Sequence, residues 1–159
     1  MAYRLLVHGK EVAMRVGDRM IRSQLTVKPW MALKGASELL HRHRIRHLLV
    51  TDQGRLIGIV TEQDIRRALQ LGAARLEFHE LLYLLDTVRV QDIMTTEVIS
   101  VTPDTPVEEA ARIMVENKIG CLPVLKGDML MGIVTRDDLL AALVDPVGAW
   151  SNPARLEAA

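Results

Sequence analysis

The chain has 159 residues, of which 49% are hydrophobic and only 3% aromatic, so one compact unit with a largely aliphatic core is expected. Its formal net charge is zero and its basic residues have no interleaved aromatic side chains, which argues against nucleic-acid binding. No apolar run approaches the roughly 20 residues of a membrane span. The single cysteine, Cys121, rules out an internal disulfide, and we expect a cytoplasmic protein.

The charge is unevenly distributed along the chain. Residues up to Arg75 include 14 Lys or Arg and 6 Asp or Glu, whereas residues from Leu76 onward include 6 and 14. Two differently solvated surfaces would explain this split. Alternatively, the basic half of one copy would face the acidic half of another, which would favour an antiparallel dimer.

Four elements are predicted in the first part of the chain. Tyr3–Val7, in an N-terminal extension without the pattern of a signal peptide, predicts a strand. The alternation over Ser23–Val27 predicts another strand, followed by a turn at Pro29. Apolar side chains at helical spacing then predict a helix over residues 31–44. Next, Leu48–Thr51 and Leu56–Val60 predict a hairpin that turns at residues 52–55.

A helix is predicted to begin after Thr61, whose hydroxyl is suited to cap it. The apolar stripe of Leu76–Val88 then predicts a packed linker helix. In the part that follows, Glu97–Val101 predicts a strand. Thr105 is predicted to be the N-cap of a helix, with Glu108 completing a capping box.

The chain is an internal duplication with an offset of 74 positions. Gly58–Asp64 reads GIVTEQD and Gly132–Asp138 reads GIVTRDD, and Val16–Leu69 matches Val90–Leu143 at 17 of 54 positions without a gap. Two β-α-β-β-α units related by a pseudo-two-fold axis are therefore predicted, an α/β (α+β) fold. The expected parts are an N-terminal extension (1–15), two repeats (16–72 and 90–144), a linker helix between them (73–89) and a flexible tail (145–159).

These features resemble a known family. Each unit opens with Val-x-Asp-x-Met, at Val16–Met20 and Val90–Met94, and closes with Gly-Ile-Val-Thr-x-x-Asp. Together the units are similar to a tandem pair of CBS domains, a Bateman module, of the stand-alone bacterial type. The resemblance covers roughly residues 16 to 144. It implies a regulatory module that binds an adenine nucleotide (AMP, ADP or ATP, in some relatives S-adenosylmethionine) in the cleft between the repeats, with no obligatory cofactor and no metal.

The resemblance also implies which residues would contact the nucleotide. Asp64 and Asp138 would accept hydrogen bonds from the ribose diol. Thr61 and Thr135 would offer hydroxyls at helix N-termini, where exposed N–H groups and the helix dipole favour phosphate. Glycines would let the backbone approach the ligand, and aliphatic residues would enclose the purine. These further positions are Gly58, Gly132, Ile59, Ile133, Leu48, Leu122 and the residues that follow Met20 and Met94.

A plainer interpretation stands beside this one. Thr61 and Thr135 would serve only as helix caps, and the two aspartates only as first-turn acids that complement the helix dipole. The clefts would then be empty, and the module would be a structural one that binds another protein.

The segment His41–His47 (HRHRIRH) is strongly basic, whereas its counterpart Val115–Cys121 is nearly uncharged. Arg46 and His47 fall where nucleotide-binding relatives place residues that contact phosphate. The resemblance therefore implies a phosphate clamp in the first repeat and two unequal sites. A solvated helix end, with cations near the negative end of the dipole, is the alternative. A metal site is not expected, because no Cys or carboxylate partner lies at a suitable spacing.

Catalysis is not expected, since the chain has no Walker loop, Gly-x-Gly-x-x-Gly, Cys-x-x-Cys or Ser-His-Asp ordering. A single module is expected to expose apolar helix faces, so a homodimer is predicted, together with a protein target that the sequence does not name. The residues expected on those faces are Met31, Leu39, Leu40, Ile113 and Met114.

Overall fold

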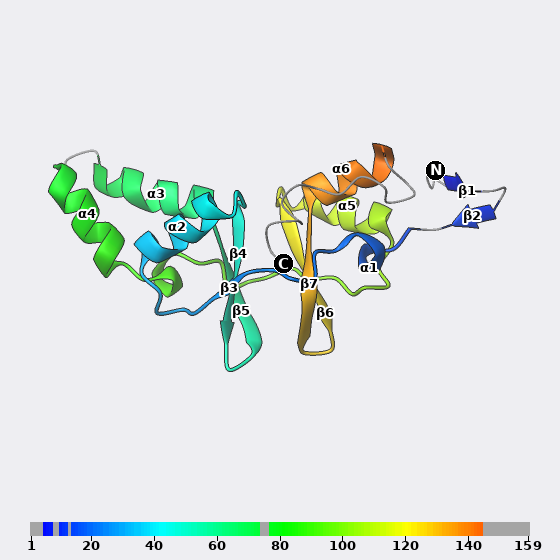
Figure 1. The fold of residues 1–159 in the computed structure, drawn as a ribbon, viewed down its shortest axis with the longest axis horizontal. Coiled ribbons are helices and arrows are strands. Elements are labelled where there is room, and N and C mark those ends of the chain that lie inside the picture. Colours follow the sequence, from blue (N-terminus) through cyan, green and yellow to red (C-terminus); the bar gives the residue numbers. More distant parts are fainter. Residues whose placement is uncertain (1–4, 8–9, 13, 74–76, 145–159) are drawn as a thin grey trace. The chain divides into compact units, whose positions relative to one another are not determined.

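The computed structural model describes residues 5–7, 10–12, 14–73 and 77–144. They form two compact units (Figure 1). Gln24–Val98 makes up one, called here the first-repeat unit. The second-repeat unit consists of the residues up to Ser23 together with those from Ile99 onward. Each unit thus combines the body of one repeat with the segment that opens the other. The predicted tail over 145–159 lies outside the described residues.

The sheet of the first-repeat unit has the order β3-β4-β5. Strand β3 (Thr26–Val27) is parallel to β4 (His47–Asp52), which pairs in antiparallel fashion with β5 (Arg55–Thr61). The predicted hairpin is confirmed. Its turn residues Gln53 and Gly54 have φ values of 47° and 80°, the left-handed conformation that a tight two-residue turn requires.

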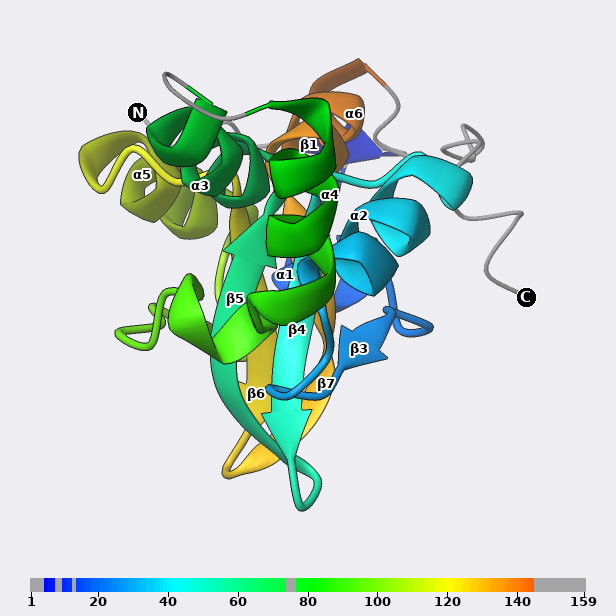
Figure 2. The same ribbon diagram turned by 90° about the vertical axis from the view of Figure 1, so that its left-hand side faces the viewer.

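Three helices pack in the first-repeat unit (Figure 2). These are α2 (Leu33–Arg42), α3 (Glu62–Ala73) and α4 (Phe78–Thr87), and α4 contacts both of the others. The predicted packed linker helix is therefore confirmed as α4. A short 3-10 helix, η1 (Val90–Asp92), belongs to the same unit. The buried core of the unit consists of Val27, Leu33, Ala36, Leu40, Leu48, Val50, Val60, Ile65 and Val90.

The second-repeat unit contains the matching hairpin of β6 (Cys121–Lys126) and β7 (Met129–Thr135), with helices α5 (Val107–Glu116) and α6 (Arg136–Val144). Helix α1 (Val16–Arg19) packs against α6. The core consists of Val16, Met20, Val101, Val107, Ala110, Met114, Leu122, Val124, Val134, Leu139 and Ala142. In the N-terminal extension, β1 (Leu5–Val7) pairs with β2 (Lys10–Val12), so the expected strand there is confirmed over Leu5–Val7.

The strand expected over Glu97–Val101 is wrong. Only Val101 pairs, in a parallel bridge to Val124 that matches the pairing of Val27 with Val50. The amide of Val101 donates to the carbonyl of Pro123 at 3.0 Å. The next ladder bond would need an N–H on Pro123, which proline lacks, so the pairing stops after one residue.

The N-cap expected at Thr105 is also wrong. Helix α5 begins one residue later, with Pro106 at the cap position, and the Thr105 hydroxyl instead accepts a 3.1 Å bond from the amide of Thr102. The first amide of the helix, on Val107, donates to the carbonyl of Met14 at 3.0 Å. The chain before the opening segment therefore supplies the acceptor that a capping side chain would otherwise provide.

The apolar helix residues expected to be exposed belong largely to the cores. Leu40 and Met114 are buried, and Met31, Leu39 and Ile113 are partly buried against the two clusters. The expected exposure is therefore wrong for Leu40 and Met114, because these two side chains pack into the cores of their own units. Large exposed apolar side chains lie elsewhere, among them Leu82 and Tyr83 on α4 and Leu140, Leu143 and Val144 on α6.

Candidate ligand site at two strand-to-helix junctions

The junction between β5 and α3 carries the first pair of predicted ribose and phosphate contacts, Thr61 and Asp64. The amide and the hydroxyl of Thr61 donate to Oδ2 of Asp64 at 2.9 and 2.6 Å. In return, the amide of Asp64 donates to the Thr61 hydroxyl at 3.1 Å. This reciprocal cap fixes the start of the helix, and it uses one carboxylate oxygen of Asp64 while leaving Oδ1 outside the cap.

The junction between β7 and α6 repeats this arrangement. Thr135 donates to Oδ2 of Asp138 from its amide at 2.9 Å and from its hydroxyl at 2.6 Å, and the amide of Asp138 lies 3.4 Å from the hydroxyl oxygen. The two junctions differ in burial, because Asp138 is 2% exposed whereas Asp64 is half-buried. Both copies therefore act as helix caps, as the plainer interpretation of the sequence expected.

The two glycines predicted to face a ligand face the chain itself. A Cβ on Gly58 would lie 2.6 Å from Sδ of Met94 and 3.0 Å from the carbonyl oxygen of Thr95. A Cβ on Gly132 would lie 2.5 Å from the carbonyl oxygen of Ile21. The close approach that requires glycine is thus made by the opening segment of the other repeat. The predicted approach of a ligand to the backbone at these two positions stays a prediction.

The predicted walls divide into two kinds. Leu48 and Leu122 have no exposed surface and lie within the cores, where they support the sheets from behind. Ile59 is half-buried and pairs with Thr95, the residue after Met94. Ile133 is 6% exposed and pairs with Ile21, the residue after Met20.

The basic residues of the first repeat lie beside the α3 N-terminus. Arg46 precedes β4 and His47 is its first residue, and the amide of Glu62, the first residue of α3, donates to the Arg46 carbonyl at 3.1 Å. Arg46 is exposed and His47 half-buried. This backbone bond places Arg46 one residue from the cap made by Thr61, where a cation and the positive end of the helix dipole both favour an anion.

Sequence reasoning missed Arg136 in the second repeat. The equivalent backbone bond runs from the Arg136 amide to the Gly120 carbonyl at 2.9 Å, and the Arg136 guanidinium donates to the carbonyl of Ile119 at 3.2 Å. Before strand β6 the second repeat has Gly120 in place of Arg46, but at the start of helix α6 it has Arg136 in place of Glu62. The signal was present in the sequence, because the second repeat lacks an arginine at the position of Arg46 (Gly120) and has one at the position of Glu62 (Arg136).

Within residues 5–7, 10–12, 14–73 and 77–144, each helix is too short or too polar to span a bilayer. No group of three or more His, Cys, Asp or Glu side chains among these residues is placed to hold a metal ion.

With this geometry established, the comparisons with known proteins identify the family. The CBS domain family matches residues 16–71 and again residues 90–145. The chain therefore belongs to the CBS domain family and carries two copies of the domain. Proteins of this family are generally regulatory and not catalytic.

Two solved structures share this fold over most of their length. The chain is 31% identical to CBSX2, solved in complex with AMP, with a TM-score of 0.69 and coverage of 83% of this chain and 97% of that one. It is 27% identical to the CBS domain pair of protein MJ0100, solved with 5′-methylthioadenosine and S-adenosyl-L-methionine, with a TM-score of 0.72 and coverage of 85% and 99%.

A curated relative is much longer. Homoserine O-acetyltransferase from Methanohalobium evestigatum is 32% identical over 126 residues, which cover 78% of this chain and 23% of that enzyme. The chain thus spans less than a quarter of the relative's length, and the acetyltransferase name describes the longer protein.

Proposed function

We propose that this CBS pair is a regulatory module that binds an adenine nucleotide or a related adenosine derivative and passes its occupancy to a protein partner. One observation carries the proposal: each repeat places a Thr–Asp pair at a helix N-terminus, next to an arginine. Carboxylate oxygens suit a ribose diol, and a helix N-terminus with an arginine suits phosphate. The complexes of CBSX2 with AMP and of the MJ0100 pair with adenosine derivatives support the same ligand class.

Regulation would follow from differential binding. A ligand whose ribose is held by Asp64 or by Asp138 would favour one arrangement of the module over others. A partner that recognises that arrangement would then respond to ligand concentration. The expected inputs are AMP, ADP, ATP and S-adenosylmethionine.

Thermal unfolding with each of these four compounds tests the proposal. A ligand that binds only the native state adds about 2.7 kcal/mol at a hundredfold excess over its Kd, which raises the melting temperature visibly. The informative variant is Asp64→Asn rather than alanine, because an Asn oxygen keeps the acceptor for Thr61 and so preserves the cap. We expect Asp64→Asn to unfold nearly as the parent does without ligand but to lose most of the ligand-induced shift.

The matched control is Asp92→Asn. Asp92 Oδ2 also accepts a backbone bond, at 2.8 Å from the Arg89 amide, but at the start of η1 rather than at a β–α junction. It should keep the full ligand-induced shift. Equal shifts in Asp64→Asn, Asp92→Asn and the parent would remove Asp64 from the site.

A structural module without a small ligand is the second candidate. It is favoured by the finding that the caps at Thr61 and Thr135 and the packing at Gly58 and Gly132 already account for these residues. Unchanged melting curves with all four compounds would select this function over the first.

Self-association is part of the proposal. Leu140, Leu143 and Val144 on α6 are 55%, 59% and 79% exposed, and a homodimer would cover such side chains. The basic and acidic halves of the sequence support an antiparallel arrangement. Light scattering at micromolar concentration tests this, and a monomeric mass would reject it. A free, buried Cys121 accords with the proposed cytoplasmic location.

A further inference from the structure

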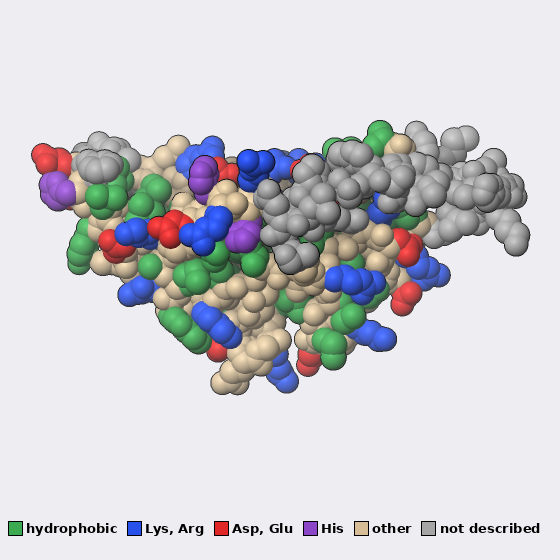
Figure 3. All heavy atoms as spheres, in the orientation of Figure 1, with side chains coloured by type: hydrophobic (Ala, Val, Ile, Leu, Met, Phe, Trp, Pro, Cys, Tyr) green, Lys and Arg blue, Asp and Glu red, His purple; other side chains and the backbone are tan. Residues whose placement is uncertain are grey.

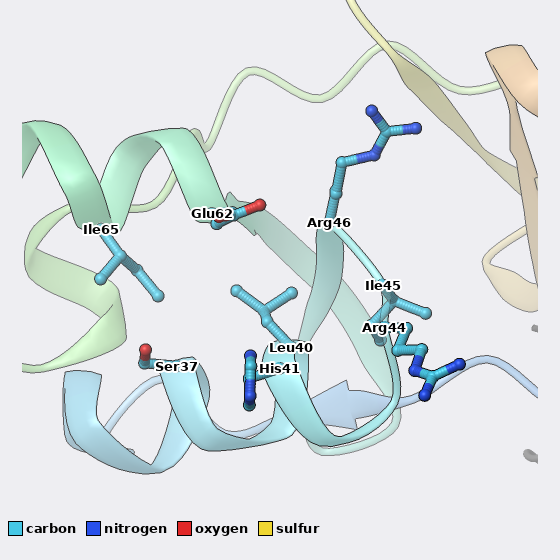
Figure 4. A pocket seen from close by; sticks show the side chains of 8 residues that line it. All are labelled: Ser37, Leu40, His41, Arg44, Ile45, Arg46, Glu62 and Ile65. Atoms are coloured by element: carbon cyan, nitrogen blue, oxygen red, sulfur yellow. The ribbon is translucent and has the colours of Figure 1, made fainter.

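The first-repeat unit contains a groove of about 520 Å³ between the end of α2 and the start of α3 (Figure 4). Its apolar lining comes from Leu40, Ile45 and Ile65, and its cationic or potentially cationic lining from His41, Arg44 and Arg46. Figure 4 shows the Arg44 and Arg46 side chains extending in different directions from the loop between α2 and β4, at the side of the groove where that loop lies. In the space-filling view, the Lys, Arg and His side chains on the visible face of this unit are interspersed with Asp and Glu side chains (Figure 3).

The groove adjoins the first candidate site. Glu62, which lines the groove, lies between Thr61 and Asp64 in the chain and bonds through its amide to Arg46 at 3.1 Å. A phosphate held at this junction would therefore stand at the entrance of the groove. The one carboxylate in the lining, that of Glu62, is partly offset by its ion pair with the Arg66 guanidinium, at 2.7 Å from Oε1.

The carbonyl groups at the C-terminus of α2 are hydrogen-bonded, which reduces their repulsion of an anion. Helix C-termini normally repel anions through their unsatisfied carbonyls. Here the carbonyls of Leu40 and His41 accept bonds from the amides of Ile45 and Arg44, at 3.0 and 3.2 Å. The left-handed conformation of Arg44, with φ of 50°, closes this cap. What remains at the surface is the basic side chains.

The second repeat keeps only part of this lining. His41 and Arg46 are replaced there by Val115 and Gly120, and Lys118 takes the place of Arg44. Val115 is 77% exposed, so an apolar side chain stands where the first repeat has a histidine. Arg136 supplies a cation at the β7–α6 junction, which suits a single phosphate. The adjoining turn around Lys118 has no guanidinium group to recognise further phosphates.

We infer that the groove of the first repeat receives the outer phosphates of a nucleoside di- or triphosphate, whereas the second repeat is suited to a nucleoside monophosphate or an uncharged nucleoside. The inference rests on the proposed adenine-nucleotide function. It assigns His41 and Arg44, which lie outside the β5–α3 junction, to the outer phosphates. The first repeat would then be the one that distinguishes ATP from AMP.

Titration calorimetry with ATP and AMP tests the inference on a matched pair of variants, Arg44→Asn and Lys118→Asn. The two residues occupy equivalent turns with φ of 50° and 55°, and Asn tolerates this left-handed conformation, so neither change strains the backbone. We expect Arg44→Asn to weaken ATP binding about tenfold, the loss of a charge-assisted bond, while AMP binding changes less than twofold. Lys118→Asn should leave both nearly unchanged.

His41→Gln gives a second test that does not depend on the turn, since His41 is exposed in the last turn of α2. It should also weaken ATP more than AMP. An unchanged ratio of ATP to AMP affinity in both Arg44→Asn and His41→Gln would overturn the inference while leaving the proposed function in place. If the parent binds neither nucleotide, the inference fails, and the proposed function then depends on the melting curves with ADP and S-adenosylmethionine.

Discussion

Ile21 and Ile133 exchange two main-chain hydrogen bonds, of 2.8 Å from the amide of Ile21 and 3.0 Å from that of Ile133. Ile59 and Thr95 do the same in the other unit, at 3.0 and 2.9 Å. Each pair joins the last strand of one repeat to the opening segment of the other. Gly132 lies directly beside the first pair, so a side chain at this position would meet the Ile21 carbonyl.

Gly132→Ala is expected to destabilise the protein by about 2–3 kcal/mol. The new Cβ would lie 2.5 Å from the carbonyl oxygen of Ile21, and this oxygen cannot move away without loss of its bond to the Ile133 amide. Urea unfolding followed by circular dichroism measures the change. Stability equal to that of the parent would show that the opening segment does not pack as described.

Gly35→Ala is expected to act in the opposite direction and to stabilise by about 0.5–1 kcal/mol. Gly35 lies within α2, and its Cβ would make an ordinary contact, 3.5 Å from Cγ of Met31. The same urea experiment measures it. Because alanine is introduced in both variants, a destabilised Gly35→Ala would undermine the steric explanation given for Gly132.

Thr135→Val should cost more stability than Thr61→Val, about 2–3 against about 1 kcal/mol. Both changes remove the hydroxyl that donates to an aspartate at 2.6 Å, but Asp138 is 2% exposed, whereas water can reach Asp64 to replace the lost bond. The controls Thr61→Ser and Thr135→Ser keep the hydroxyl and should stay close to the parent. Equal losses in the two valine variants would contradict the difference in burial.

Stability is expected to fall above pH 9 through Cys121. Burial raises the pKa of this thiol from 9.0 to about 12, so the native state keeps the proton over a range in which the unfolded chain releases it. The unfolded state is therefore favoured as pH rises through this window, by about 1.4 kcal/mol at pH 10. Below about pH 8 the group contributes almost no pH dependence.

The Cys121→Ala variant isolates this effect, because other groups also titrate near pH 10. The free energy of unfolding of the parent should fall between pH 8 and pH 10 by about 1.4 kcal/mol more than that of the variant. A thiol reagent should likewise modify the native protein only slowly at pH 8. Parallel pH profiles for the parent and the variant would show that the thiol is not buried.

Much of the fold was predictable because it is encoded by neighbouring residues. Apolar spacing predicted α2 and α4, the capping residue Thr61 predicted the start of α3, and the turn residues 52–55 between two apolar runs predicted the β4–β5 hairpin. The cap by Thr61 followed from the same short-range logic. The failures at Thr105 and Pro123 have a different origin, since the Val107 amide finds its acceptor at Met14, and a missing N–H ends a ladder to a distant strand.

The candidate site was predictable in its residue types but not in their roles. The repeated sequence around Gly58 and Gly132 indicated that side chains are forbidden there. It could not indicate whether a ligand or another part of the chain comes close, since Ile21 and Gly132 are far apart in the sequence. Arg136 was overlooked because its role becomes visible only when its amide is seen bonded to Gly120.

The exchange of opening segments has a consequence for the origin of the chain. In this chain the opening segment of each repeat pairs with the last strand of the other repeat, at Ile59 and at Ile133. A protein with a single repeat packed in this way would leave that strand edge unpaired. Two copies of such a protein could pair these edges by exchanging their opening segments, as in a domain-swapped dimer. Gene fusion then makes the exchange intramolecular and raises the effective concentration of each opening segment at its partner strand. Once fused, the two halves no longer have to be identical, so one could acquire Arg46 and the other Gly120 and Arg136 while the exchanged opening segments remained in place.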